Sequence, residues 1–190
     1  MNCKIRSFNL DRAMAFGYKP TITQRVIHLR SKPHVHTELQ FSERYNNISF
    51  SATLMNDDDG ARFAGIEYSH EADRWDTVIV PMTDKQEDKV FNKALYMAGC
   101  IAHYCEDGKF YNIENVSDNI KYDLIGQLCH LTNLKIWKPN PLKTWCTKAV
   151  NTAISEGRLD FYALLVDLGN VGELRPDQLD MMARWYFRGE

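Results

Sequence analysis

The hydrophobic periodicity of this chain changes once, near residue 83. Before that point, apolar and polar residues alternate over short segments bounded by turn residues, a pattern typical of half-buried strands. After it, apolar residues recur at spacings of three and four, as on one face of a helix. Strands first and helices mostly after them favour the α+β class, with an antiparallel sheet packed with helices.

Strands are predicted at 22–29, 35–41, 48–53, 61–67 and 75–80. In the second of these, alternation places His36 and Glu38 together on the polar face, about 6.5–7 Å apart along the strand. The polar, turn-like residues between the second and third segments predict a hairpin. Ser51 lies across that hairpin, also on its polar face.

Helices are predicted at 83–105, 121–131, 145–156, 158–168 and 176–186. Thr83 and Gln86 have the spacing of a capping box, and Glu106-Asp107-Gly108 is expected to end the first helix. Gly157 is expected to stop the 145–156 helix. Pro176 suits the first position of the last helix, where a missing N–H costs nothing.

Composition limits the class of protein. The chain has 190 residues, of which 44% are hydrophobic and 25% charged, so we expect one globular domain over residues 1–190. With a net charge of −2, no bulk field attracts nucleic acid or an anionic membrane. No run approaches the roughly 20 apolar residues of a membrane span, and the N-terminus lacks the apolar region of a secretory signal. A cytoplasmic location, in the producing or infected cell, is therefore expected.

The number and spacing of the cysteines also limit the class of protein. A cytosolic setting keeps thiols reduced, and the chain has five cysteines with no CxxC pair. Neither a disulfide framework nor a cysteine zinc site is indicated. His34 and His36 could hold a metal, but two ligands on one strand do not make a zinc site. We expect no metal and no cofactor.

Cys146 opens the helix predicted at 145–156. A thiol at a helix N-terminus lies at the positive end of the macrodipole, which favours the thiolate. A thiolate within reach of an imidazole is the working unit of a cysteine hydrolase, and His36 is the candidate base. The competing interpretation is a core thiol, because Cys146, Ala149, Val150 and Ala153 form one helical stripe.

An ordered set of short motifs resembles the circularly permuted, NlpC-type papain-like thiol hydrolases, including members encoded by bacteriophages. The matching residues are His36-Thr37-Glu38-Leu39, Ser49-Phe50-Ser51-Ala52, Asp59-Gly60-Ala61-Arg62-Phe63, Trp75-Asp76, Tyr122-Asp123-Leu124-Ile125-Gly126 and Trp145-Cys146-Thr147. The resemblance implies a papain-like core over about 22–156, with a helical extension at 157–190. Thr147 departs from the serine usual in the family. Triad chemistry depends on geometry and not on chain order, so a histidine before the cysteine is no objection.

The resemblance also implies roles for single residues. Cys146 would be the nucleophile and His36 the general base. Glu38 would orient the imidazolium, with Ser51 as the competing third member. Tyr122 would help to bind the oxyanion.

The expected activity is cleavage of a peptide or isopeptide amide through an acyl-enzyme, on a peptide or protein-conjugate substrate. The first alternative is a non-catalytic binding or inhibitory module on the same scaffold, phage-encoded and holding a host protein. A weaker alternative is an acyltransferase or lipid hydrolase, since one fold hosts several acyl-transfer activities.

Overall fold

The computed structural model describes residues 2–54, 59–66, 68, 73–123, 127, 143–167 and 174–188. Its main sheet is antiparallel and contains β1 (Asn2–Asn9), β2 (His34–Gln40), β3 (Ser49–Thr53), β4 (Gly60–Ala64) and β5 (Trp75–Pro81), in the order β4-β3-β2-β1-β5. A separate hairpin pairs β6 (Cys100–Tyr104) with β7 (Phe110–Asn115). The α+β class with an antiparallel sheet is confirmed.

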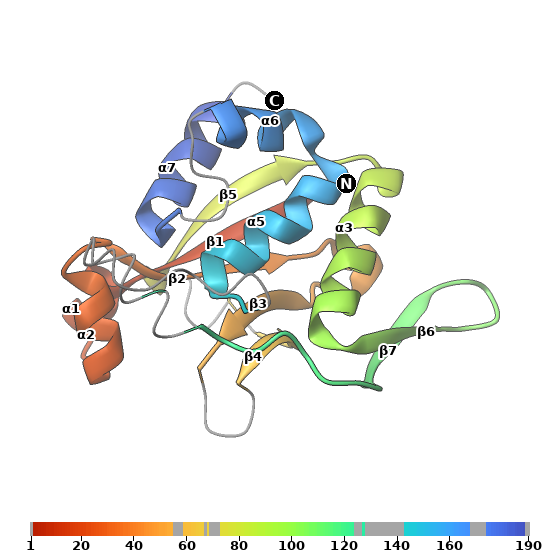
Figure 1. Ribbon diagram of the computed structural model, residues 1–190, viewed down its shortest axis with the longest axis horizontal. Coiled ribbons are helices and arrows are strands. Elements are labelled where there is room, and N and C mark those ends of the chain that lie inside the picture. Colours follow the sequence, from red (N-terminus) through yellow and green to blue (C-terminus); the bar gives the residue numbers. More distant parts are fainter. Residues whose placement is uncertain are drawn as a thin grey trace.

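Six α-helices surround the sheet in the described part of the chain. They are α1 (Leu10–Ala15), α2 (Ile22–His28), α3 (Asp84–Ala98), α5 (Cys146–Gly157), α6 (Leu159–Asp167) and α7 (Pro176–Tyr186), with a short 3-10 helix η1 at Glu43–Tyr45. Helices α3 and α5 lie side by side over one face of the sheet, and the β6–β7 hairpin projects from the body (Figure 1). None of the helices in the described ranges has the length and apolar composition needed to cross a membrane.

The main core lies between the sheet and the pair α3 and α5. Leu39 and Phe50 from the sheet, Phe91 from α3 and Ile154 from α5 are each at most 1% exposed within it. Tyr45 stacks on Phe91 with ring centroids 3.8 Å apart. This packing fixes α5 against β2 and β3, the two strands that carry the candidate site.

Strand β1 is an interior strand of the sheet, between β2 and the edge strand β5, although no strand is predicted for residues 2–9. Its buried residues Cys3 and Ile5 alternate with the less buried Lys4 and Arg6. The segment is short and mostly polar, so its alternation is weak as a local signal. Pairing with two neighbours makes it a strand.

The strand predicted at 22–29 is wrong, because Ile22–His28 form helix α2. Thr21 caps this helix: its side chain accepts from the Gln24 N–H, and the Gln24 side chain accepts from the Thr21 N–H. That capping box outweighs the apparent alternation. Two of the apolar residues that suggested a buried strand face are exposed, Ile22 at 83% and Leu29 at 74%.

The helix predicted at 83–105 begins as expected but ends early. The capping box of Thr83 and Gln86 is present at the start of α3. Gly99 then adopts φ +66 and ends the helix, and residues 100–104 form β6. The turn residues at 106–108 therefore lie in the β6–β7 hairpin and not at a helix end.

The remaining strand predictions are confirmed to within a few residues, as are the helices α5, α6 and α7, with Pro176 opening the last. The helix predicted at 121–131 lies mostly outside the described residues.

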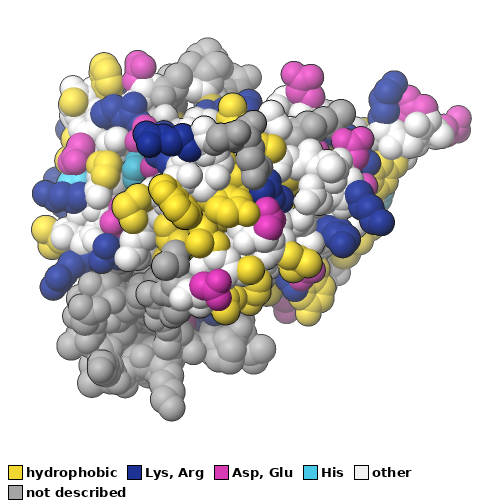
Figure 2. Space-filling model, turned by 90° about the horizontal axis from the view of Figure 1, so that it is seen from above, with side chains coloured by type: hydrophobic (Ala, Val, Ile, Leu, Met, Phe, Trp, Pro, Cys, Tyr) yellow, Lys and Arg dark blue, Asp and Glu magenta, His cyan; other side chains and the backbone are white. Residues whose placement is uncertain are grey.

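Helix α7 contacts β1, β2 and β5, so the C-terminal extension packs on the same sheet. Figure 2 views the molecule from the side of α6 and α7 and shows hydrophobic side chains gathered on that face. The exposed apolar residues of the two helices are Leu159, Tyr162, Val166, Met181 and Trp185.

Candidate active site

The site forms where strands β2 and β3 diverge. The two strands pair at Leu39–Phe50 and at Gln40–Ser49. Beyond this point the backbone of Thr37 has other partners: its carbonyl accepts from the Ser51 hydroxyl at 2.6 Å, and its N–H donates to the sulfur of Cys146. The sulfur therefore occupies the edge of β2 that a continued β3 would have covered.

Cys146 is the first residue of α5, and packing of this helix on β2 and β3 brings the sulfur to the sheet. Burial acts to raise the pKa of the Cys146 thiol. The hydrogen bond to His36 and its positive charge, with smaller help from the Thr37 N–H and the Thr147 hydroxyl, outweigh burial and lower the pKa. The position of the thiol at the helix N-terminus acts in the same direction, because the positive end of the helix dipole favours the thiolate.

His36 lies between the sulfur and a carboxylate. Its Nε2 is 3.0 Å from Oε1 of Glu38, and it also hydrogen-bonds to Cys146. Burial acts to lower the pKa of His36, but the bonds and charges of Cys146 and then of Glu38 raise it to about 10. The fold therefore brings together the three predicted residues Cys146, His36 and Glu38, with His36 between the thiol and the carboxylate.

Glu38 is buried, with 3% of its surface exposed. Burial acts to raise the pKa of its carboxyl group, but the hydrogen bond and charge of His36, then the hydrogen bond from Tyr68, lower it overall. The side chain is ionised at neutral pH and sits beside the imidazolium.

Tyr68 is a residue of this group that the sequence reasoning missed. It comes from the connection between β4 and β5, and its hydroxyl donates to Oε2 of Glu38. Ser49 is the second partner of that hydroxyl, at 2.6 Å. A tyrosine in a polar connection matches no motif, so no local signal could have assigned it to the site.

The other two predicted site residues have different partners. The Ser51 hydroxyl bonds to the Thr37 carbonyl, which leaves Glu38 as the residue that contacts His36. The Tyr122 hydroxyl donates to Oε1 of Gln127 at 2.6 Å, and both residues are buried. The charge of Cys146 raises the pKa of Tyr122 in addition to burial, which places this ring near the sulfur.

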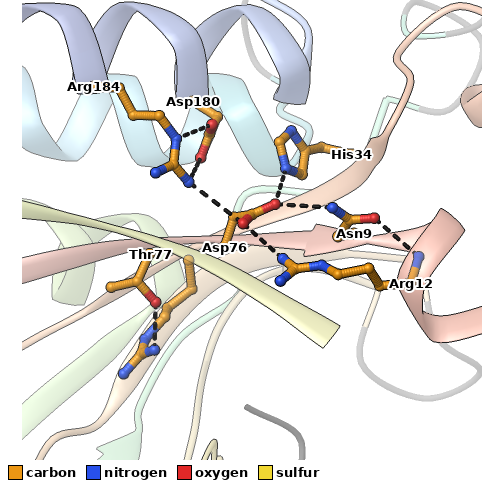
Figure 3. A network of polar contacts seen from close by, with 8 residues as sticks. Asn9, Arg12, His34, Asp76, Thr77, Asp180 and Arg184 are labelled. Atoms are coloured by element: carbon orange, nitrogen blue, oxygen red, sulfur yellow. Dashed lines mark hydrogen bonds and ion pairs between the residues drawn. The ribbon is translucent and has the colours of Figure 1, made fainter. Parts of the chain in front are cut away.

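A polar network supports the end of β2 beside the site (Figure 3). Asp76 accepts from His34 Nε2 at 2.7 Å and from Asn9 at 2.9 Å, and it pairs with Arg12 at 2.6 Å and Arg184 at 3.6 Å. His34 is thus bound to Asp76 and His36 to Glu38, so the two histidines have separate partners. The adjacent Trp75 ring lies edge-on to His36, with centroids 6.3 Å apart.

Access to the sulfur is restricted. Cys146 is 1% exposed, whereas the side chain of His36 is 23% exposed. A groove of about 580 Å³ lies elsewhere, between β4 and the β6–β7 hairpin. A substrate carbonyl would approach from the His36 side, and neighbouring groups would have to move to admit it.

Comparison with protein-family models, curated proteins and solved structures returned no match. The resemblance to permuted papain-like hydrolases accordingly stays a prediction from the motifs.

Proposed function

We propose that this protein is a cysteine hydrolase that cleaves a peptide or isopeptide amide through an acyl-enzyme. The proposal is supported by the position of Cys146 at the first residue of α5, close enough for its charge to act on His36, whose Nε2 lies 3.0 Å from Oε1 of Glu38. In this arrangement the pKa of the thiol is lowered and the pKa of the imidazole is raised to about 10. Residues far apart in the chain seldom produce such a pair by core packing alone, and strongly perturbed pKa values cluster at functional sites.

The mechanism follows from the order of the three residues. His36 holds the proton taken from Cys146, and the thiolate attacks the substrate carbonyl carbon. The imidazolium then protonates the leaving amine as the tetrahedral intermediate collapses to the thioester. Neutral His36 next removes a proton from water, whose attack on the thioester releases the acid and restores the Cys146 thiolate beside the His36 imidazolium. Glu38 stabilises the imidazolium in the first half of this cycle.

Backbone donors would stabilise the oxyanion. The N–H of Cys146, at the first position of α5, belongs to the helix-terminal N–H groups that have no partner within the helix. Tyr122 is the predicted second donor. Its hydroxyl donates to Gln127, so this role requires the hydroxyl to exchange Gln127 for the oxyanion.

Alkylation tests the activated pair. Iodoacetamide near pH 7 should modify Cys146 ahead of the exposed Cys105, as read by peptide mass spectrometry. His36→Ala should suppress this modification. The control is His103→Ala, because His103 also contacts a carboxylate, Glu114 at 2.7 Å, in the β6–β7 hairpin. Faster labelling of Cys105, unaffected by the His36 change, would contradict the proposal.

A non-catalytic binding module is the second candidate, and the 1% exposure of Cys146 favours it. The two candidate functions differ in whether Cys146 can be acylated by an activated ester. Incubation with p-nitrophenyl acetate should leave an acetyl group on Cys146 in a hydrolase, and Cys146→Ala should abolish it. A thiolate that iodoacetamide alkylates but that no activated ester acylates would support the binding module.

A further inference from the structure

We propose that Tyr68 is a positioning residue that fixes the Glu38 carboxylate toward His36 and thereby sets the pH range over which the Cys146–His36 ion pair exists. This inference rests on the proposed function, because it concerns the same site. It is carried by the contacts of the Glu38 side chain and of the Tyr68 ring.

Each oxygen of the Glu38 carboxylate has its own partner. Oε1 is 3.0 Å from Nε2 of His36, and Oε2 accepts from the Tyr68 hydroxyl. The side chain is 4% exposed, so water cannot replace either donor. A buried carboxylate that loses one of its donors becomes harder to ionise or turns toward another donor. Either outcome weakens the stabilisation of the His36 imidazolium by Glu38.

The surroundings hold Tyr68 in this place. Because the Tyr68 hydroxyl gives its hydrogen to Glu38, the Ser49 hydroxyl donates to the Tyr68 oxygen. The Arg6 guanidinium lies over the ring, 4.5 Å from its centroid, and the Trp75 ring meets it edge-on at 5.2 Å. Arg6 is fixed in turn by Gln40 and Thr77 from the neighbouring strands.

Removal of the hydroxyl has opposite effects on the two members of the ion pair. Without Tyr68 as donor, Glu38 supports the imidazolium less, so His36 should lose its proton at lower pH. The thiolate, which depends on that positive charge, should form at higher pH. Because the two protonation steps belong to one coupled pair, both midpoints should move together and toward each other.

Tyr68→Phe is the direct test, with two readouts. The pH dependence of Cys146 alkylation by iodoacetamide gives the midpoint of thiolate formation, and NMR of histidine-labelled protein gives the midpoint of His36. We expect shifts of about one pH unit each, upward for the thiolate and downward for the imidazolium, because the lost hydrogen bond is to a charged group. The alkylation rate below the midpoint should fall about tenfold.

Tyr45→Phe is the matched control, because Tyr45 is a buried tyrosine that donates to a carboxylate, Asp88 at 2.5 Å, away from the site. It should leave both midpoints unchanged. Ser49→Ala is the second variant, and removal of its donor should move both midpoints in the same directions as Tyr68→Phe by a smaller amount. If neither site variant moves the midpoints of a protein whose Cys146 does form a thiolate, the inference about Tyr68 is wrong. Absence of that thiolate in the unmodified protein would instead refute the proposed function.

Discussion

Replacement of Asp76 should lower the stability of this fold more than replacement of most other partly exposed residues, and Asp76→Asn tests that expectation. Its carboxylate receives donors from β1, α1, β2 and α7 at one point, as Figure 3 shows. The amide that replaces it has nearly the same shape. One oxygen becomes an NH₂ group, which then faces hydrogen-bond donors in place of an acceptor, although Arg184 keeps its contacts with Asp180.

The size of the expected stability loss depends on how far each contact is shielded from solvent. His34 has a side chain 6% exposed and hydrogen-bonds at 2.7 Å, so its loss should cost about 1.5–3 kcal/mol. Arg12 and Arg184 are 42% and 46% exposed, and solvent limits each to under about 1 kcal/mol. We therefore expect Asp76→Asn to lower the free energy of unfolding by about 3 kcal/mol, or the Tm by about 6–12 °C.

Urea denaturation at pH 7, followed by circular dichroism, measures this change. Asp107→Asn is the control, because Asp107 also pairs with a cation, Lys109 at 2.8 Å, but lies in the exposed hairpin turn. Its replacement should change stability little. A loss below about 1 kcal/mol for Asp76→Asn, or one equal to the control, would refute the reasoning.

The pH dependence of the same variant gives a second check. Burial acts to raise the pKa of Asp76, but His34, Asn9 and Arg12 lower it below the usual 3.8. A depressed carboxyl pKa contributes stability that is present above pH 3.8 and is lost as the pH falls through the folded-state value. The stability gap between the protein and Asp76→Asn should therefore narrow in acid.

Two further predictions concern a helix end and the ion pair. Gly99→Ala should destabilise the protein by more than about 1 kcal/mol in urea denaturation, because Gly99 has φ +66 and an added Cβ would lie 2.3 Å from the Ser117 carbonyl oxygen; a neutral result would contradict it. The contribution of His36 is present below pH 6.5 and lost toward about 10, and that of Cys146 is present above pH 9.0 and lost as the pH falls. Above pH 9.0 only the His36 contribution still changes, so the stability gap to the Cys146→Ser/His36→Gln variant should narrow between pH 9.0 and about 10. A gap independent of pH throughout would contradict the shared proton.

Much of the secondary structure could be predicted because its signals are local. The capping box at Thr83 and the proline at Pro176 act within one turn of helix, and both are found where expected. Two of the errors arise where local signals competed. At residues 22–28 a capping box outweighed alternation, and after Gly99 the apolar spacing continued into a strand that pairs with β7.

The candidate site was predictable in part. Alternation places His36 and Glu38 on one face, and the helix start places Cys146 at a positive terminus. Tyr68 could not be found, because its role depends on where a connection folds over the polar face of the sheet. The choice between Glu38 and Ser51 also needed coordinates, since both lie on the same predicted face.

The amino-acid order alone determined most of the helices, most strands of the main sheet and the side chains that could do chemistry, because those properties depend largely on neighbours a few positions away. Only the folded chain decided that β1 enters the sheet between β2 and β5 and that β2 and β3 separate at Thr37, leaving the Thr37 N–H for the Cys146 sulfur. The physical reason is that this opening results from the packing of α5 against two strands, and such long-range packing has no signature in any single segment.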